Sequence, residues 1–281
     1  MEFRVFLPQI LLTEEDVTSE MYLEYQRVLT ALTALFKKCD NSLNESREDV
    51  YMVGNPHFGV KLRAGKKVEI KIRVRKLDFN VEHWKKVKLG KKSISHYRND
   101  ILGLIEADAD QRLPDDATLI NTGSIIHVRK ARSIQILHDI SKEICYVSSP
   151  DSSRQWISVA IEGALNDIQN FLLAADSESD LGLIFEALGN ASKIAKAHIA
   201  TSTKLSTFLP VVAGYPTWIR VASQVIHAEE MSEILDGVDS FLLKVRRIED
   251  STDTSQLLGN ADSKNPIDMR GRRSCCAEFC A

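Results

Sequence analysis

Long apolar segments are missing from this chain of 281 residues. No run of about 18 apolar residues occurs, which excludes a membrane-spanning helix. Cysteine is scarce as well: only Cys39 and Cys145 lie in the body of the chain, and no Cys-x-x-Cys pair occurs. A disulfide framework and a zinc site are therefore not expected. The first residues show no apolar signal segment. We accordingly expect a cytoplasmic protein.

Several catalytic motifs are missing too. The chain contains no Gly-x-x-x-x-Gly-Lys-Ser/Thr, no Gly-x-Gly-x-x-Gly and no Gly-x-Ser-x-Gly. These absences argue against a phosphate-loop fold, a dinucleotide-binding fold and a nucleophile elbow. None of the seven histidines stands in a His-x-x-x-His spacing. A histidine metal site is therefore not expected either.

What the chain does have is a strongly uneven distribution of charge. Residues 57–98 hold 14 lysines and arginines against three acidic residues, although the whole chain has a net charge of −3. A basic block of this size indicates either a solvated basic surface or a partner of opposite sign. Within it, residues 81–98 place lysines around Trp84 and Tyr97. This pattern allows single-stranded nucleic acid binding as an alternative to a solvated loop.

Hydrophobic periodicity predicts strands first and helices later. Strand patterns occur at 2–7, 49–54, 58–64, 67–75, 84–89, 124–134, 142–148 and 155–162, the fifth of them weak. Short Gly-containing turns join several of these segments, which favours antiparallel pairing. Helical patterns occur at 13–38, 95–107, 163–175, 179–200 and 217–248, and the polar residues 41–48 are predicted to form a loop.

Charged side chains share one face of several predicted strands. In segment 68–75 every second residue is charged: Glu69, Lys71, Arg73 and Arg75. Two geometries fit this alternation. One is an antiparallel sheet whose charged face meets water, and the other is a closed barrel with its charges inside. Because three like charges at this spacing repel one another, a ligand with several negative charges would stabilise either arrangement.

The order of these charged segments resembles the CYTH or triphosphate tunnel metalloenzyme superfamily, of which the chain would be a divergent member. The matching pieces are Glu2-x-Arg4, Gly59–Arg63, Val68–Arg73, Val128-x-Lys130-x-Arg132 and Trp156–Glu162. The resemblance covers about residues 1–175 and implies an α+β fold. That fold would be an eight-stranded antiparallel barrel enclosing a polar tunnel, with flanking helices and a C-terminal helical extension.

The resemblance also implies roles for individual residues. Basic side chains would bind the phosphates of a triphosphate-containing substrate such as inorganic triphosphate, a nucleotide or thiamine triphosphate: Arg4, Lys61, Arg63, Lys71, Arg73, Lys130 and Arg132. Of these, Lys71 and Arg73 would act as catalytic phosphate clamps. Carboxylates would hold Mg²⁺ or Mn²⁺, namely Glu2, Glu162 and Glu143. Glu69 could instead orient Lys71 or Arg73. The implied activity is metal-dependent hydrolysis of the triphosphate.

Three positions depart from the family pattern. The opening Glu-x-Glu-x-Lys reads Glu2-x-Arg4-x-Phe6 here, and Ala160 replaces the first carboxylate of the closing pair. An arginine beside a metal site opposes metal binding by repulsion. A second hypothesis is therefore a non-catalytic polyanion or nucleotide sensor. A third is an interaction protein that docks an acidic partner or RNA through residues 57–98, chiefly by Lys85, Lys86, Lys91 and Lys92.

The chain is predicted to consist of a barrel domain (1–175), a helical extension packed on it (176–250) and a disordered tail (251–281). The tail contains the segment Arg272–Cys276, which a membrane-associated enzyme could S-palmitoylate, although an unmodified tail is the simpler reading. Substrate, metal and oligomeric state are not determined by the sequence.

Overall fold

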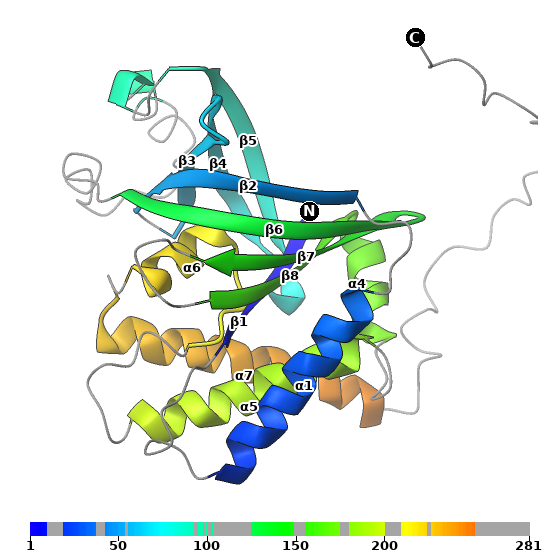
Figure 1. Ribbon diagram of the computed structural model, residues 1–281. Helices are drawn as coiled ribbons and strands as arrows, with labels where there is room; N and C mark the ends of the chain where they lie inside the picture. The colour runs from blue at the N-terminus through cyan, green and yellow to red at the C-terminus, as the bar shows by residue number, and fades with distance from the viewer. Residues whose placement is uncertain are drawn as a thin grey trace, which may run out of the picture.

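Eight β-strands form the centre of the molecule. The computed structural model in Figure 1 describes residues 1–9, 19–37, 43–53, 56–92, 95–97, 99–100, 103, 125–148, 155–174, 180–199, 209–223 and 226–250. The strands are β1 (Glu2–Gln9), β2 (Leu43–Met52), β3 (Phe58–Arg63), β4 (Lys67–Lys76), β5 (Glu82–Gly90), β6 (Ile125–Leu137), β7 (Ile140–Ser148) and β8 (Gln155–Gly163).

The strands close into a barrel in the order β1-β5-β4-β3-β2-β6-β7-β8, and every neighbouring pair is antiparallel. Strand β1 closes the ring because it pairs with β8 along its whole length and with β5 at Glu2↔Glu82. The predicted α+β fold with an eight-stranded antiparallel barrel is therefore confirmed. The weak segment 84–89 is a full strand, β5.

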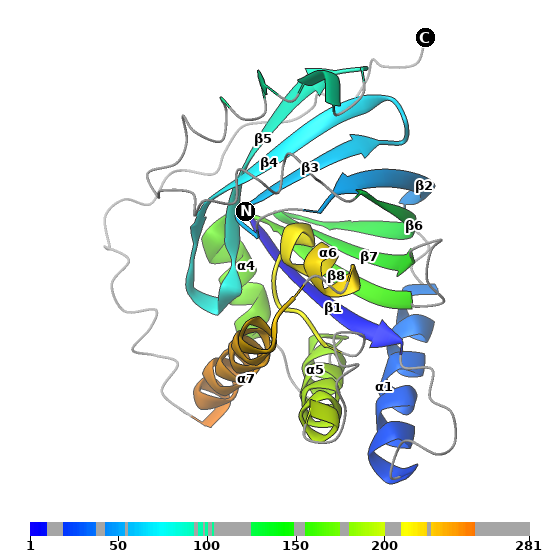
Figure 2. The same ribbon diagram turned by 90° about the vertical axis from the view of Figure 1, so that its left-hand side faces the viewer.

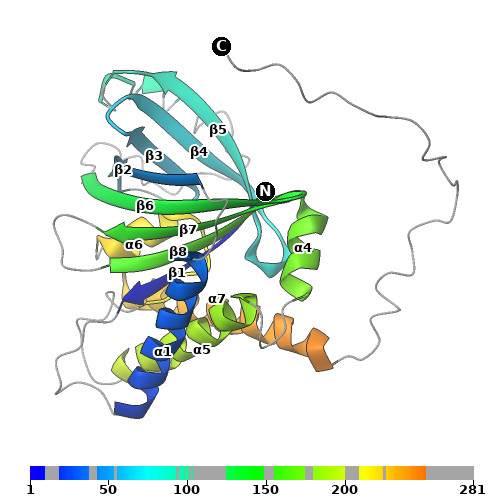
Figure 3. The ribbon, with the colours of Figure 1, turned by 45° about the vertical axis from the view of Figure 1, so that its right-hand side comes forward.

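Helices cover one side of the barrel. The described residues contain α1 (Ser19–Lys37), α4 (Leu165–Leu173), α5 (Asp180–Ile199), α6 (Tyr215–Ala222) and α7 (Ala228–Asp250), with 3₁₀ turns η1 (Asp78–Asn80) and η2 (Ser95–Tyr97). Figure 3 shows α1, α5 and α7 as a layer beside β1 and β8. Within the described part of the chain, no helix is both long and apolar enough to span a membrane.

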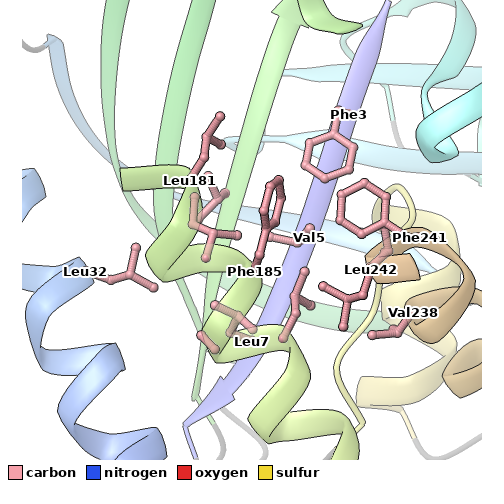
Figure 4. Packing of buried hydrophobic residues seen from close by; sticks show 14 of the residues in the cluster. Phe3, Val5, Leu7, Leu32, Leu181, Phe185, Val238, Phe241 and Leu242 are labelled. Carbon is pink, nitrogen blue, oxygen red and sulfur yellow. The ribbon is translucent and has the colours of Figure 1, made fainter. Parts of the chain in front are cut away.

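The alternation along β1 explains why this layer forms. Phe3, Val5 and Leu7 point out of the barrel and are fully buried beneath the helices, as Figure 4 shows. Phe3 stacks on Phe241 of α7 with ring centroids 5.1 Å apart. Burial of apolar surface on the outside leaves the opposite face of β1 directed into the barrel.

Helix α6 lies at one end of the barrel, the end that faces the viewer in Figure 2. The segment before it is bound to β1, because Phe6 and Val211 exchange two backbone hydrogen bonds of 2.8 and 3.0 Å. Trp218 of α6 stacks on Phe6 with centroids 4.9 Å apart and meets Trp156 of β8 edge-on. This end of the barrel is therefore filled by aromatic side chains from α6 and the strands around it.

Two predicted elements need correction. The polar segment 41–48 is not a loop, because β2 begins at Leu43 and pairs with β6 from its first residue. The predicted helix 217–248 is two helices, since α6 buries its apolar face against the barrel end and α7 buries its own beneath β1. Of the predicted helix 95–107, the structure describes the 3₁₀ turn η2 and helical residues at 99–100 and 103, and the rest of that segment lies outside the described residues. The tail 251–281 lies outside them too.

Candidate anion-binding site

The charged faces of the strands meet in one cavity inside the barrel. The cavity, here called the barrel pocket, has a volume of about 250 Å³. Its lining includes nine basic residues from six strands: Arg4, Arg47, Lys61, Arg63, Lys71, Lys86, Lys88, Lys130 and Arg132. Among the residues that the structure describes, three carboxylates line it, Glu69, Glu143 and Glu162. The pocket is therefore strongly basic, although the chain as a whole is acidic.

The exposure of these cations shows which end of the pocket is open. The Lys130 side chain is 2% exposed and that of Lys61 14%, whereas Arg63 reaches 38% and Lys86 56%. The buried cations lie near α6 and the exposed ones lie toward the opposite barrel end. Tyr215 and Pro216 of α6 both line the pocket. Within the described residues, the pocket thus has a buried floor beside Tyr215 and Pro216 and an exposed mouth beside Arg63 and Lys86.

The floor combines cations with aromatic rings. The ammonium group of Lys130 lies 3.6 Å from the ring centroid of Tyr215 and 4.7 Å from that of Tyr51. It also donates a hydrogen bond to the Tyr51 hydroxyl and lies 3.2 Å from a carboxylate oxygen of Asp49. Cation–π contacts and a buried carboxylate therefore hold this ammonium group in place.

Burial lowers the pKa of the deepest lysines. For Lys61, burial outweighs the attraction of Asp49 and lowers the pKa to about 8. For Lys130, burial again acts first and the charge of Lys61 adds to it, so that the pKa falls well below its usual range. Burial thus disfavours the charge of both ammonium groups, and a bound anion would favour it.

The predicted metal ligands contact cations. Arg4 Nε lies 2.6 Å from Glu2 Oε1, and Arg4 Nη1 lies 3.0 Å from Glu143 Oε1. Burial opposes ionisation of Glu2, but Lys71 and Arg4 outweigh it and hold its pKa far below the ordinary value. Glu162 lies at the mouth, 4.0 Å from Lys86.

These contacts do not fit a Mg²⁺ or Mn²⁺ centre. No group of three or more His, Cys, Asp or Glu side chains that could hold a metal ion occurs among the residues that the structure describes. The guanidinium of Arg4 lies within ion-pair distance of both Glu2 and Glu143, so a divalent cation there would meet a fixed positive charge.

Most of the predicted phosphate contacts line the pocket, and Arg73 does not. Arg73 is not part of the pocket lining; it donates to Glu82 at 3.0 Å and contacts His57 at 2.7 Å. Glu2 is directed into the barrel on the same face as Arg4 but does not line the pocket, and it is bound to Lys71 Nζ at 2.7 Å. Glu69 lies 3.5 Å from Lys61 and 3.6 Å from Arg63. It therefore pairs with these two pocket cations, whereas the sequence suggested Lys71 or Arg73 as its partner.

Sequence reasoning missed four residues around the pocket. Arg47 and Tyr51 line it from β2, Asp49 binds Lys130 and Lys61, and Tyr215 covers the floor. The alternation of Glu45, Arg47 and Asp49 was a usable signal for the β2 residues, because it continues the pattern of β3 and β4. Nothing in the sequence near Tyr215 indicates that it meets the barrel interior.

Comparisons with known proteins leave the family open. No family model matches the chain, and no curated protein matches it. Among solved structures, a conserved hypothetical protein from Pyrococcus furiosus aligns over 67% of this chain and 91% of its own, with 13% identity and a TM-score of 0.30. That likeness is too low to carry an argument, so the fold rests on the strand pairing described above.

Proposed function

We propose that the barrel pocket binds a small polyanion that carries a chain of phosphates, such as a triphosphate. The observation that carries the proposal is the convergence of nine cations from six strands on one cavity with three carboxylates in its lining. Cations held this close repel one another, and burial removes the water that would screen them. Even with Glu2, Glu45 and Asp49, which pair with these cations from outside the lining, the cations outnumber the carboxylates, and a bound polyanion would add the negative charge that balances them.

The residue types suit phosphate oxygens. Arginine offers a planar fork of donors that matches a phosphate group, and lysine offers a compact charge. Arg63 and Lys86 are the most exposed of these cations, Lys61 and Arg132 are intermediate, and Lys130 is buried, so donors are present along the depth of the pocket. An extended anion would thus meet cations along its length rather than at one point.

The size of the pocket limits what can enter. Pockets that hold drug-sized ligands measure roughly 300 to 1,000 Å³, and the barrel pocket measures about 250 Å³. A phosphate chain fits this space better than a whole nucleotide. Any organic part of the ligand would lie at the mouth, beside Lys86, Lys88 and Glu162.

Two neighbouring lysines of β5 provide a matched test. Lys86 lines the pocket, whereas Lys85 does not and belongs to the opposite strand face. Isothermal titration calorimetry with tripolyphosphate should show weaker binding, by about tenfold, for Lys86→Gln and no change for Lys85→Gln. Equal losses in both variants would instead favour docking of RNA or an acidic protein on the outer basic surface.

A deeper variant tests the pocket itself. Lys61→Gln removes a buried cation, and we expect tripolyphosphate binding to weaken by about 10–100-fold. Unchanged affinity in this variant would contradict the proposed site. Phosphate release from tripolyphosphate with added Mg²⁺ or Mn²⁺ then decides whether hydrolysis accompanies binding. Intact binding without release makes the protein a binding module.

A further inference from the structure

Arg4 joins three strands at the pocket wall. Its side chain is 4% exposed and makes three charged or polar contacts: with Glu2 on β1, with Glu143 on β7 and with Ser158 on β8, the last at 2.8 Å. Its guanidinium also lies over the Tyr215 ring, 4.8 Å from the centroid. Arg4 is thus a fixed part of the wall and not a mobile side chain.

The two carboxylates beside Arg4 have cation partners on both oxygens. The second oxygen of Glu2 accepts from Lys71 Nζ at 2.7 Å, and the second oxygen of Glu143 accepts from Arg132 Nη1 at 3.0 Å. A hard divalent cation takes about six oxygen ligands, most of them from carboxylates, carbonyls and water. Here the oxygens that could serve are already neutralised by the protein.

The geometry of Glu143 shows the same pairing. Its side chain is 12% exposed, and it lies 3.0 Å from Arg4 on one oxygen and 3.0 Å from Arg132 on the other. The negative charge of this carboxylate is therefore balanced by two arginines of the protein.

From these contacts we infer that the guanidinium of Arg4 takes the place of a divalent cation, and that the pocket binds its polyanion as the free anion rather than as a magnesium complex. The inference rests on the proposed function of the barrel pocket. It adds the chemical form of the ligand and a role for Arg4, which positions Glu2 and Glu143 and contributes fixed positive charge.

The metal part is tested without any phosphate ligand. Electron paramagnetic resonance of Mn²⁺ titrated into the full-length protein should show that the wild-type pocket leaves the ion free. Arg4→Gln frees one oxygen on each of Glu2 and Glu143, and this variant should gain one Mn²⁺ site. Adding Glu143→Gln to it should remove that site again. Arg129→Gln, on the exposed outer face of β6, is the control and should behave as wild type.

Two results would overturn the inference. One is a stoichiometric Mn²⁺ site in the wild-type protein that Glu143→Gln abolishes. The other is a folded Arg4→Gln protein that gains no site, which would mean that Arg4 does not stand in for a metal. Circular dichroism checks that the Arg4→Gln protein folds. If it does not fold, the Mn²⁺ titration of the wild-type protein decides whether the pocket holds a metal ion.

The ligand part is tested by calorimetry with tripolyphosphate in EDTA and in excess Mg²⁺. Binding should persist in EDTA and weaken with Mg²⁺ in proportion to the ligand that magnesium sequesters. Binding that requires Mg²⁺, or is strengthened by it, would disprove the inference and leave the proposed function standing. Absence of binding in both conditions would remove the proposed function, while the Mn²⁺ titration would still report on Arg4.

Discussion

Lys61 is the residue at which charge, burial and binding are most closely linked. Asp49 at 3.8 Å and Glu69 at 3.5 Å stabilise its charge, whereas burial and the charge of Lys71 oppose it. The balance lowers the pKa of Lys61 to about 8, so a fraction of this side chain is neutral in mildly alkaline solution. A phosphate bound beside it would raise that pKa again.

Tripolyphosphate affinity should therefore fall as pH rises above about 8. Below that pH, Lys61 is charged in both the free and the bound protein and contributes no pH dependence. Above it, Lys61 loses its proton in the free protein but keeps it in the complex. The dissociation constant then rises by up to about tenfold per pH unit, until the pH reaches the pKa of Lys61 in the complex. Calorimetry between pH 7 and 9.5, in buffers of different ionisation enthalpy, measures both the affinity and the proton uptake.

Lys61→Arg serves as the control, because an arginine stays charged throughout this range. The ionisation of the ligand itself is the same in both titrations and cancels in the comparison. An equal slope for wild type and Lys61→Arg would show that another group, such as Lys130, controls the pH dependence.

At the scale of elements, α6 converts an open barrel end into a closed floor. Gly214 precedes the helix and donates its backbone N–H to Glu82 at 2.8 Å. A Cβ at this position would lie 2.7 Å from Glu82 Oε2 and 2.8 Å from Trp84. The close approach of α6 to β5 therefore depends on the absence of a side chain, not on an unusual backbone conformation.

Gly214→Ala should lower the free energy of unfolding by about 1–3 kcal/mol, because the buried Glu82 and the half-buried Trp84 must move to accommodate the methyl group. The same change should weaken tripolyphosphate binding, because Tyr215, the next residue in the chain, lies on the pocket floor. The matched control is Gly237→Ala in α7, where a Cβ meets nothing within 4 Å. That change should stabilise by about 0.5–1 kcal/mol through helix propensity. Chemical denaturation measures the free energy of unfolding of both variants, and an equal change in the two would contradict the role of Gly214.

The elements also show what the sequence could predict. Strands β3 and β4 were predictable because buried apolar residues such as Val60 and Val68 alternate with charged residues, several of which line the pocket. The first half of β2 was harder to predict, because Ser46 and Glu48 are exposed on its outer face and Arg47 is directed inward. The alternating charges of Glu45, Arg47 and Asp49 were a signal, but no apolar face accompanies them. Where a strand has a charged inner face and a solvated outer face, it lacks the alternation of apolar and polar residues on which strand prediction relies.

The floor was beyond sequence reasoning for a different reason. Lys130 and Lys61 could be assigned to a common face from alternation alone. Tyr215, however, reaches the pocket from a helix that follows the barrel strands in sequence, and its place depends on tertiary packing against Phe6 and Tyr51. Local patterns carry no information about such a contact.

At the scale of the whole molecule, barrel and helices share one hydrophobic core. A single cluster of buried residues includes Phe3 of β1, Leu32 of α1, Ile168 of α4, Ile184 of α5 and Phe241 of α7. Strand β1 belongs to this core on one face and carries Arg4 of the pocket on the other. Packing of the helical layer therefore supports the position of the pocket wall, and the two parts should unfold together.

Phe241→Ala tests this coupling, because Phe241 stacks on Phe3 and also meets Phe185 of α5 edge-on at 5.4 Å. We expect a loss of about 3–5 kcal/mol in the free energy of unfolding, from lost burial and the cavity left behind. Leu243→Ala, two residues along α7 and 54% exposed, should change stability by less than about 1 kcal/mol. Urea denaturation followed by far-ultraviolet circular dichroism and by fluorescence of the three tryptophans, Trp84, Trp156 and Trp218, should give coincident transitions in every variant. A helical signal that disappears before the tryptophan signal would mean that the barrel is stable without its helices, and that the pocket does not depend on them.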